Sequence, residues 1–339
     1  MSENTNQAPL LEVKHLRKLF PAKSGFLAKE KTYIKAVDDV SFTLMPRETL
    51  GVVGESGCGK STMGRSVLRL IEPTDGEILY KGEDFRKANG QQLRGMRADM
   101  QIIFQDPYAS LNPRMTVGEV IAEPLNIQKR CNSKEEVREQ VLKVMEVVGL
   151  NPKYYNRYPH EFSGGQRQRI GIARAIVLQP SLVVCDEPVS ALDVSIQSQV
   201  LNLLRKLQQS MGMAYIFISH NLSVIKHISD RVMVMYLGHV VEMADKKELF
   251  DNSSHPYTQA LLSAIPIPER HSKRKKIILQ GDLPSPANPP SGCIFHTRCF
   301  MAQEICSKQK PELKEITDGH LCACHFCGQG QIPCGNKGE

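Results

Sequence analysis

The sequence has no long hydrophobic run. No stretch of its 339 residues approaches the roughly 20 apolar residues that are needed to span a bilayer. The first residues, from Met1 to Gln7, are polar and resemble no secretory signal. We therefore expect no membrane-spanning segment and no export, so the chain should remain in the cytosol.

Aromatic residues are also few. They make up 6% of the chain, and tryptophan is absent. The net charge is +7, and part of it lies in a basic run at 270–276. Such a run can bind nucleic acid or an anionic membrane surface. Because no aromatic residue interleaves it, we interpret it as a solvated linker and expect no nucleic-acid partner.

A glycine-rich motif of the form G-x-x-x-x-G-K-[ST] occurs once, at 54–61. The apolar run at 49–53 predicts a strand before it, and the pattern at 62–70 predicts a helix after it, which is the context that a phosphate-binding loop requires. The backbone N–H groups of such a loop and the helix N-terminus can wrap a triphosphate. The predicted nucleotide-binding residues are Gly54, Glu55, Ser56, Gly57, Cys58, Gly59, Lys60, Ser61 and Thr62.

Four polar side chains are predicted to carry the chemistry of this site. Lys60 can bridge the β- and γ-phosphates of a bound triphosphate, and the hydroxyl of Ser61 can supply one oxygen to Mg²⁺. Asp186 ends an apolar strand at 182–186 and can hold Mg²⁺ through its water shell. Glu187, directly after it, is placed to polarise an attacking water.

The remaining pattern predicts an α/β protein with a mixed sheet as its core. Strands are expected at 11–16, 40–44, 76–82, 101–104 and 214–218, and a long helix at 194–210. Strands that alternate with helices favour parallel βαβ units. We expect a nucleotide-binding domain at 1–250 with an inserted helical subdomain at about 106–165, and a C-terminal extension at 251–339 that contains a proline-rich linker at 283–290.

The chain contains ten cysteines, and seven of them lie between Cys293 and Cys334. In a cytosolic chain this favours metal or redox chemistry over a disulfide framework. Four thiolates on a short irregular loop suit either a [4Fe–4S] cluster or tetrahedral Zn²⁺. The spacing C-x5-C-x6-C is not the short C-x2-C of zinc ribbons, which favours iron–sulfur. Because Cys322, Cys327 and Cys334 provide additional thiols, the identity of the fourth ligand is not determined. These three cysteines could form a second metal site or remain as thiols that bind no metal.

The order of the motifs resembles that of the ATPase subunits of ABC transporters. Gln105 matches the Q-loop glutamine of that family, residues 190–193 match its D-loop, and His220 matches its switch histidine. Its signature motif is matched by Ser163, Gly164, Gly165 and Gln166, with Phe162 in place of the usual preceding leucine. The resemblance implies a P-loop ABC-type ATPase fold.

The resemblance also implies roles for these residues. Two ATPases would sandwich two nucleotides head to tail, so that Ser163 faces the γ-phosphate held by the partner's loop. His220 would contact the γ-phosphate, and Gln105 would sense Mg²⁺ and link the site to the membrane subunit. The adenine would stack on an upstream aromatic residue, for which Phe20 is preferred over Tyr33.

The segments at 104–113, 158–169, 255–262 and 292–325 resemble the oligopeptide/dipeptide importer group, and within it the second, F-type ATPase subunit. This implies a subunit that hydrolyses ATP to energise peptide import, peripheral to the cytoplasmic face of the inner membrane. Its partners would be a second ATPase subunit in a heterodimer, two membrane permease subunits and an extracytoplasmic substrate-binding protein. The iron–sulfur site of some members carries over to Cys293, Cys299, Cys306 and Cys324.

Two alternative functions remain at this point. Importers of nickel and of other small solutes share the same group. A soluble ABC ATPase acting on nucleic acid or ribosomes is the other alternative, but such proteins usually carry two tandem ATPase halves or a long coiled coil, and the sequence has neither.

Overall fold

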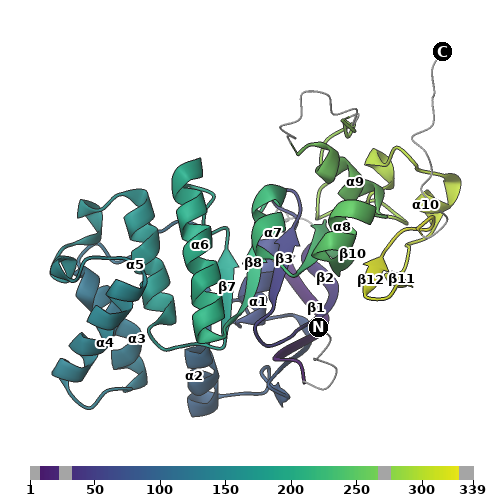
Figure 1. Cartoon of the computed structure of the whole chain (residues 1–339). Coiled ribbons are helices and arrows are strands. Elements are labelled where there is room, and N and C mark those ends of the chain that lie inside the picture. Colours follow the sequence, from purple (N-terminus) through teal and green to yellow (C-terminus); the bar gives the residue numbers. More distant parts are fainter. Residues whose placement is uncertain (1–7, 23–32, 266–275, 328–339) are drawn as a thin grey trace.

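The computed structural model describes residues 8–22, 33–265 and 276–327 (Figure 1). Residues 270–275 of the basic run and Cys334 lie outside the described residues. The described part of the chain forms one eight-stranded sheet and one four-stranded sheet. It contains no helix that is long and apolar enough to cross a membrane.

The eight-stranded sheet is mixed, with the order β11-β12-β10-β9-β3-β8-β7-β6. Its strands from β9 to β6 run parallel, whereas β10, β12 and β11 are antiparallel to their neighbours. Every residue of β3, β7 and β8 is buried, as expected for parallel strands that are covered on both faces. The strands are β3 (Thr49–Val53), β6 (Met100–Ile103), β7 (Leu182–Asp186), β8 (Ala214–Ile218), β9 (Arg231–Tyr236), β10 (His239–Asp245), β11 (Lys314–Thr317) and β12 (His320–Cys322).

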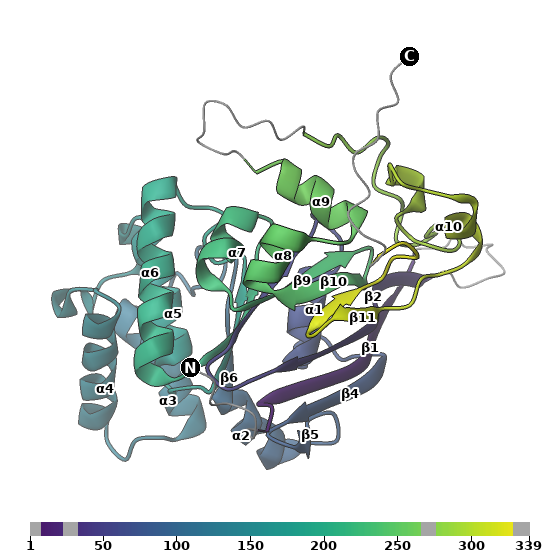
Figure 2. The ribbon, with the colours of Figure 1, turned by 45° about the vertical axis from the view of Figure 1, so that its right-hand side comes forward.

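The smaller sheet is antiparallel and has the order β2-β1-β4-β5 (Figure 2). Its strands are β1 (Leu11–Pro21), β2 (Tyr33–Leu44), β4 (Asp75–Tyr80) and β5 (Glu83–Asp84). Strands β1 and β2 are longer than the alternation in the sequence predicts, because they continue beyond the half-buried segments as a paired ribbon, in which Phe20 lies opposite Ile34. Helix α1 (Lys60–Val67) shares a hydrophobic cluster with this sheet.

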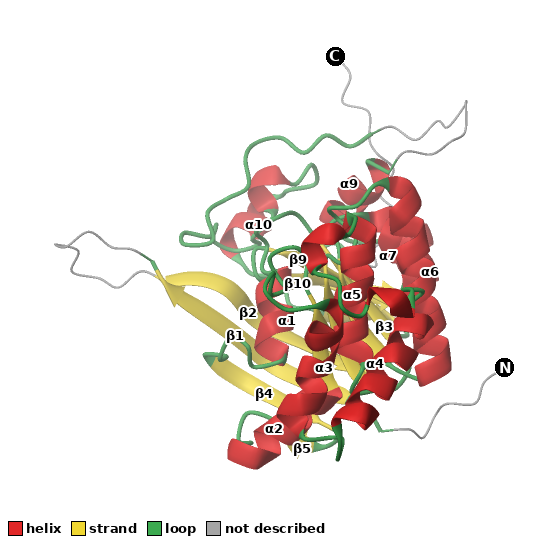
Figure 3. Cartoon of the chain, turned by 90° about the vertical axis from the view of Figure 1, so that its left-hand side faces the viewer, coloured by secondary structure: helices red, strands yellow, loops and turns green. Residues whose placement is uncertain are grey.

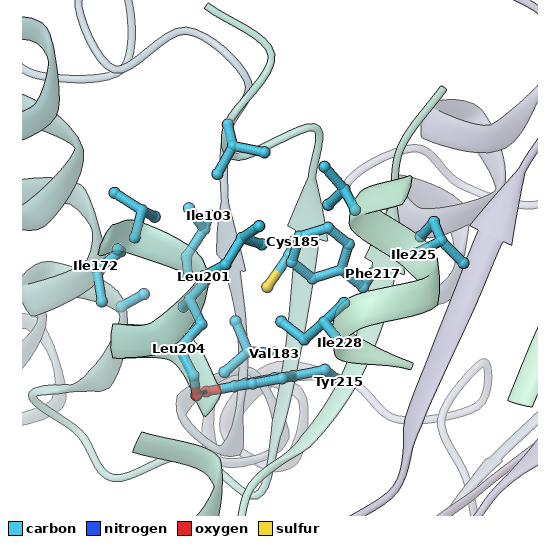
Figure 4. Packing of buried hydrophobic residues seen from close by; sticks show 14 of the residues in the cluster. Ile103, Ile172, Val183, Cys185, Leu201, Leu204, Tyr215, Phe217, Ile225 and Ile228 are labelled. Carbon is cyan, nitrogen blue, oxygen red and sulfur yellow. Dashed lines mark hydrogen bonds between the residues drawn. The ribbon is translucent and has the colours of Figure 1, made fainter. Parts of the chain in front are cut away.

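Helices cover the other face of the central sheet (Figure 3). The predicted helical insertion contains α3 (Val117–Gln128) and α4 (Lys134–Val147), which pack with α5 (Gly164–Ile176). Figure 4 shows how α5, α6 (Val194–Met211) and α7 (Leu222–Ile228) place Ile172, Leu204 and Ile225 against the strands. Tyr215 of β8 is buried in this cluster, and its hydroxyl donates to the Leu204 carbonyl at 3.0 Å. Helix α2 (Gly90–Asp99), which the sequence analysis did not predict, leads into β6.

The C-terminal extension is attached to the central sheet. Helix α8 (Lys246–Asn252) spans the expected boundary, and the elements after it are α9 (Pro256–Ser263), α10 (Glu304–Lys308), β11, β12 and the 3₁₀ turn η3 (His296–Arg298). Strand β12 pairs with β10, with Cys322 opposite Glu242. The proline-rich linker also returns to the N-terminal part, because the Lys35 N–H donates to the Pro286 carbonyl at 3.4 Å. The expected division at residue 250 stays a prediction.

A buried ion pair joins β12 to β10. His320 Nε2 lies 2.8 Å from Glu242 Oε1, and the side chains are 1% and 0% exposed. Its other ring nitrogen lies 3.6 Å from Glu248. Burial opposes the charged form of His320, but the hydrogen bond to Glu242 and the nearby carboxylates outweigh burial and raise its pKa. When it is protonated, the imidazole therefore stabilises the attachment of the C-terminal strands.

We expect His320→Gln to lower stability in a pH-dependent way. Because the folded-state pKa is raised, the stabilisation is complete below the ordinary histidine pKa of about 6.5 and is lost as the pH rises through the folded-state value. Thermal unfolding should show a loss of about 1.5–3 kcal/mol at acidic pH, the range for hydrogen bonds to charged groups, and a smaller loss at alkaline pH. His227→Gln, at an exposed site on α7, is the control. A loss that is independent of pH would contradict this role.

Candidate nucleotide-binding site

The glycine-rich loop connects β3 to α1, as the sequence predicts. Gly54, Gly57 and Gly59 have φ values of +152°, +80° and +102°. At Gly59 an added Cβ would lie 2.0 Å from the carbonyl oxygen of Ala36, so a side chain would clash with the backbone there. The loop therefore requires glycine at this position for both conformational and steric reasons.

Lys60 lies inside the curve of this loop. The side chain is only 4% exposed, and its Nζ donates to the carbonyl oxygens of Gly54 at 2.8 Å and Glu55 at 2.9 Å. Two carbonyls from the first residues of the loop thus hold the ammonium group at the pocket that the loop lines. This is the position in which a lysine can approach phosphate oxygens.

Ser61 and Asp186 meet next to Lys60, although 125 positions separate them in the sequence. Ser61 Oγ donates to Asp186 Oδ1 at 2.6 Å, and Arg65 Nη2 lies 3.0 Å from Asp186 Oδ2. Asp186 is 1% exposed. A hydroxyl and a carboxylate are oxygen donors of the type that Mg²⁺ prefers. The sequence analysis missed Arg65, which lies one helical turn after Ser61 and therefore on the same face of α1.

Three predicted site residues meet at Glu187, the residue that follows Asp186 in the chain. Glu187 Oε2 accepts a hydrogen bond from Gln105 Nε2 at 3.1 Å and lies 3.1 Å from His220 Nδ1. These residues follow the carboxyl ends of β7, β6 and β8, which are neighbours at one edge of the parallel strands. Glu187, Gln105 and His220 line the same open pocket of about 470 Å³ as Lys60 and Ser61.

The signature segment is not part of this pocket. Ser163 caps α5, its Oγ accepts from the Gln166 N–H at 3.4 Å, and Gln166 completes a capping box. Ser163 and Gly164 are exposed, whereas Gly165 is buried. Among the described residues, the phosphate loop and the signature segment thus belong to separate surfaces.

The structure does not bring Phe20 into the pocket. Ile34 and Ala36 of β2 line it instead, together with Pro286 from the C-terminal linker. Phe20 lies opposite Ile34 in the β1–β2 ribbon, and Lys18 Nζ lies 4.9 Å from the centre of its ring. Tyr33, the alternative, is 44% exposed. The adenine-stacking role of Phe20 stays a prediction.

The expected metal site in the cysteine-rich tail is not supported. In the described ranges, no group of three or more histidine, cysteine, aspartate or glutamate side chains is arranged so that it could hold a metal ion. The thiols are nevertheless neighbours. Burial raises the pKa of Cys299 to about 12, and the nearby Cys324, Cys293 and Cys306 act in the same direction. The sequence analysis predicted that these thiols hold one metal group; among the described residues they are neighbours, but a metal-holding arrangement is not supported.

Two residues of the C-terminal region contact the phosphate loop, and the sequence analysis missed both. Tyr257 lies 202 positions and Arg298 lies 243 positions from Glu55, the residue that they contact. Contacts across such separations leave no local pattern in a single sequence.

Comparison with known proteins agrees with this geometry. The ABC transporter family model matches residues 37–190, and the model "Oligopeptide/dipeptide transporter, C-terminal region" matches residues 241–306. The oligopeptide transport ATP-binding protein AppF of Bacillus subtilis (strain 168) is 54% identical over 324 residues, which cover 95% of this chain and 98% of AppF. The oligopeptide transport ATP-binding protein OppF of Escherichia coli (strain K12) is 56% identical over 320 residues, which cover 93% of this chain and 95% of OppF.

A solved structure shows the same fold. The dimeric, post-hydrolysis structure of the ATP-binding cassette MJ0796 bound to ADP and Pi has a TM-score of 0.61 and 28% sequence identity, and the match covers 70% of this chain and 98% of that chain. The phosphate loop, the carboxylates after β7 and the extent of these matches lead to one conclusion. The chain belongs to the ATP-binding proteins of ABC transporters, in the group that carries the oligopeptide/dipeptide transporter C-terminal region.

Proposed function

We propose that this protein hydrolyses ATP to energise the import of dipeptides and oligopeptides. The convergence of Glu187, Gln105 and His220 on the pocket of the phosphate loop carries the hydrolytic part of the proposal. The cargo is proposed from the relatives, because AppF and OppF are named as oligopeptide transport proteins.

Each side chain has a separate task in this proposal. Lys60 binds the β- and γ-phosphates, and Ser61 and Asp186 hold Mg²⁺, which neutralises phosphate charge when it is bound. Glu187 accepts a proton from the attacking water. His220 and Gln105 contact the same oxygen of Glu187 and so orient its carboxylate toward the pocket.

The site is complete only in a dimer. Ser163 lies at the exposed N-terminus of α5, where backbone N–H groups and the helix dipole favour an anion. In a head-to-tail pair, Ser163, Gly164, Gly165 and Gln166 would face the γ-phosphate on the partner's loop. The dimeric MJ0796 structure supports such an assembly. We propose a heterodimer with a second ATPase subunit, peripheral to the cytoplasmic face of the inner membrane, with two permease subunits and an extracytoplasmic binding protein.

We also propose that Cys293, Cys299, Cys306 and Cys324 hold a [4Fe–4S] cluster, which would tie the irregular tail together. The mutual proximity of the four thiols and their chemistry as iron ligands support this. Anaerobic purification followed by iron, sulfide and zinc analysis tests it. Iron and sulfide in equal amounts, lost in Cys299→Ser, are expected. Zinc alone, or no metal, would contradict it.

Uptake by cells tests the transport function. Cells that carry the wild-type or the Glu187→Gln protein are given labelled dipeptides, oligopeptides and nickel. We expect selective loss of peptide uptake in the variant. Loss of nickel uptake alone would show that the cargo is nickel and not peptide. Unchanged uptake of all three solutes would contradict the transport role.

A further inference from the structure

The side chains of three other residues contact Glu55, the second residue of the phosphate loop, through hydrogen bonds. Its N–H donates to Tyr257 Oη at 2.9 Å, and its carbonyl accepts from Lys60 Nζ at 2.9 Å. Its carboxylate accepts from Arg298 Nη1 at 2.8 Å. Tyr257 and Arg298 belong to the C-terminal region, so two of the three contacts come from outside the ATPase motifs.

The pair of Glu55 and Arg298 is well shielded from solvent. The side chain of Arg298 is 10% exposed and that of Glu55 is 27% exposed. An exposed ion pair contributes little, because water screens it, but a partly buried charge-assisted hydrogen bond is shorter and stronger. This contact can therefore fix the position of a loop residue.

Arg298 is itself held by the segment that carries the first two clustered cysteines. Phe295 is 1% exposed, and its ring centre lies 5.3 Å from that of Tyr257 and 5.2 Å from that of Tyr236. The η3 turn that ends in Arg298 begins with a hydrogen bond from the His296 N–H to the Cys293 carbonyl, at 3.1 Å. Cys299 follows Arg298 directly. The place of the guanidinium thus depends on the packing of this cysteine-bearing segment.

We propose that Arg298 and Tyr257 are positioning residues that hold Glu55, and with it the phosphate-binding loop, in the conformation that accepts nucleotide. The affinity for ATP then depends on the C-terminal segment 293–299, which itself does not line the nucleotide pocket. The link runs through Lys60, because the carbonyls of Gly54 and Glu55 are the two oxygen acceptors of its ammonium group. The inference rests on the proposed nucleotide-binding role of this loop.

Equilibrium binding of a fluorescent ATP analogue with Mg²⁺ to the full chain tests the proposal. We expect Arg298→Gln to weaken binding about tenfold, because one partner of a shielded charge-assisted hydrogen bond is removed. Arg298→Lys should recover part of the affinity, since lysine keeps the charge but not the planar fork. Tyr257→Phe should also weaken binding, because it removes the hydroxyl that accepts the hydrogen bond from the Glu55 N–H and keeps the rest of the ring. Lys308→Gln, which removes a positive charge from α10 at an exposed site, should bind as the wild type does.

A double-mutant cycle with Glu55→Gln separates positioning from general stability. If the two side chains act through each other, the double variant should bind no more weakly than the weaker single variant. In hydrolysis assays on the assembled transporter, Arg298→Gln should raise KM for ATP while kcat at saturating ATP stays within about twofold.

The outcomes distinguish a failure of the positioning role of Arg298 from a failure of the nucleotide-binding role of the loop. Wild-type affinity in Arg298→Gln, with a lower melting temperature, would overturn the positioning role and leave the nucleotide site in place. Additive losses in the double variant would also overturn it. If Lys60→Met binds the analogue as tightly as the wild type and also hydrolyses ATP at the wild-type rate, the proposed role of the loop itself fails.

Discussion

Glu187→Gln is expected to lower ATP hydrolysis at least about 100-fold, because positioned proton transfer contributes about 10²–10⁴ to such reactions. Glutamine has nearly the same shape and keeps an oxygen near Gln105 and His220, but it cannot accept a proton from water. The contacts of Lys60, Ser61 and Asp186 are left intact, so ATP should still bind. Hydrolysis and nucleotide retention are both measured on the assembled complex.

Glu139→Gln is the matched control for this result. Glu139 forms an exposed ion pair with Lys143 on α4, and neither residue lines the nucleotide pocket. The substitution should therefore leave hydrolysis unchanged. Near-normal turnover in Glu187→Gln would show that Glu187 is not the general base. Loss of both binding and turnover would show that its main part is to maintain the site.

Lys60→Met is expected to have the opposite signature, with ATP binding itself weakened about 100-fold or more. Removing one partner of a desolvated charge pair costs about 2–5 kcal/mol. Methionine keeps much of the apolar stem, so the packing of this buried side chain is largely retained. Titration with a fluorescent ATP analogue and Mg²⁺ measures the loss, and thermal unfolding shows whether the fold is preserved.

Lys226→Met, at an exposed site on α7, controls for the change of charge. A Lys60→Met chain that binds as tightly as the wild type but hydrolyses slowly would move Lys60 from binding to catalysis. A chain that fails to fold would show that the two loop carbonyls need the ammonium group even without nucleotide, and Lys60→Arg would then separate charge from shape.

Local patterns predicted the parts of the site that lie within one loop or one strand. The strands at 49–53, 182–186 and 214–218 are confirmed, because fully buried parallel strands are short, continuous apolar runs. The phosphate loop is confirmed as the connection from β3 to α1. Its glycines adopt positive φ values, and at Gly59 a Cβ would clash with the backbone of Ala36. The order of the motifs then predicted the family.

Contacts between distant segments could not be predicted in this way. The pairing of β12 with β10 joins residues such as Cys322 and Glu242, which no spacing rule connects. The contact of Arg298 with Glu55 and the packing of Phe295 on Tyr257 depend on the tertiary fold. The spacing of the cysteines predicted a metal site that the described residues do not show, so the cluster stays a proposal.

The most direct test of the account is ATP hydrolysis by the complete transporter in liposomes, with the binding protein supplied either empty or loaded with an oligopeptide. We expect the peptide-loaded binding protein to stimulate hydrolysis, and Glu187→Gln in this subunit to remove the stimulation together with peptide uptake into the liposomes. Hydrolysis that does not respond to peptide, while peptide still enters at the wild-type rate in Glu187→Gln, would contradict the claim that this chain drives peptide import.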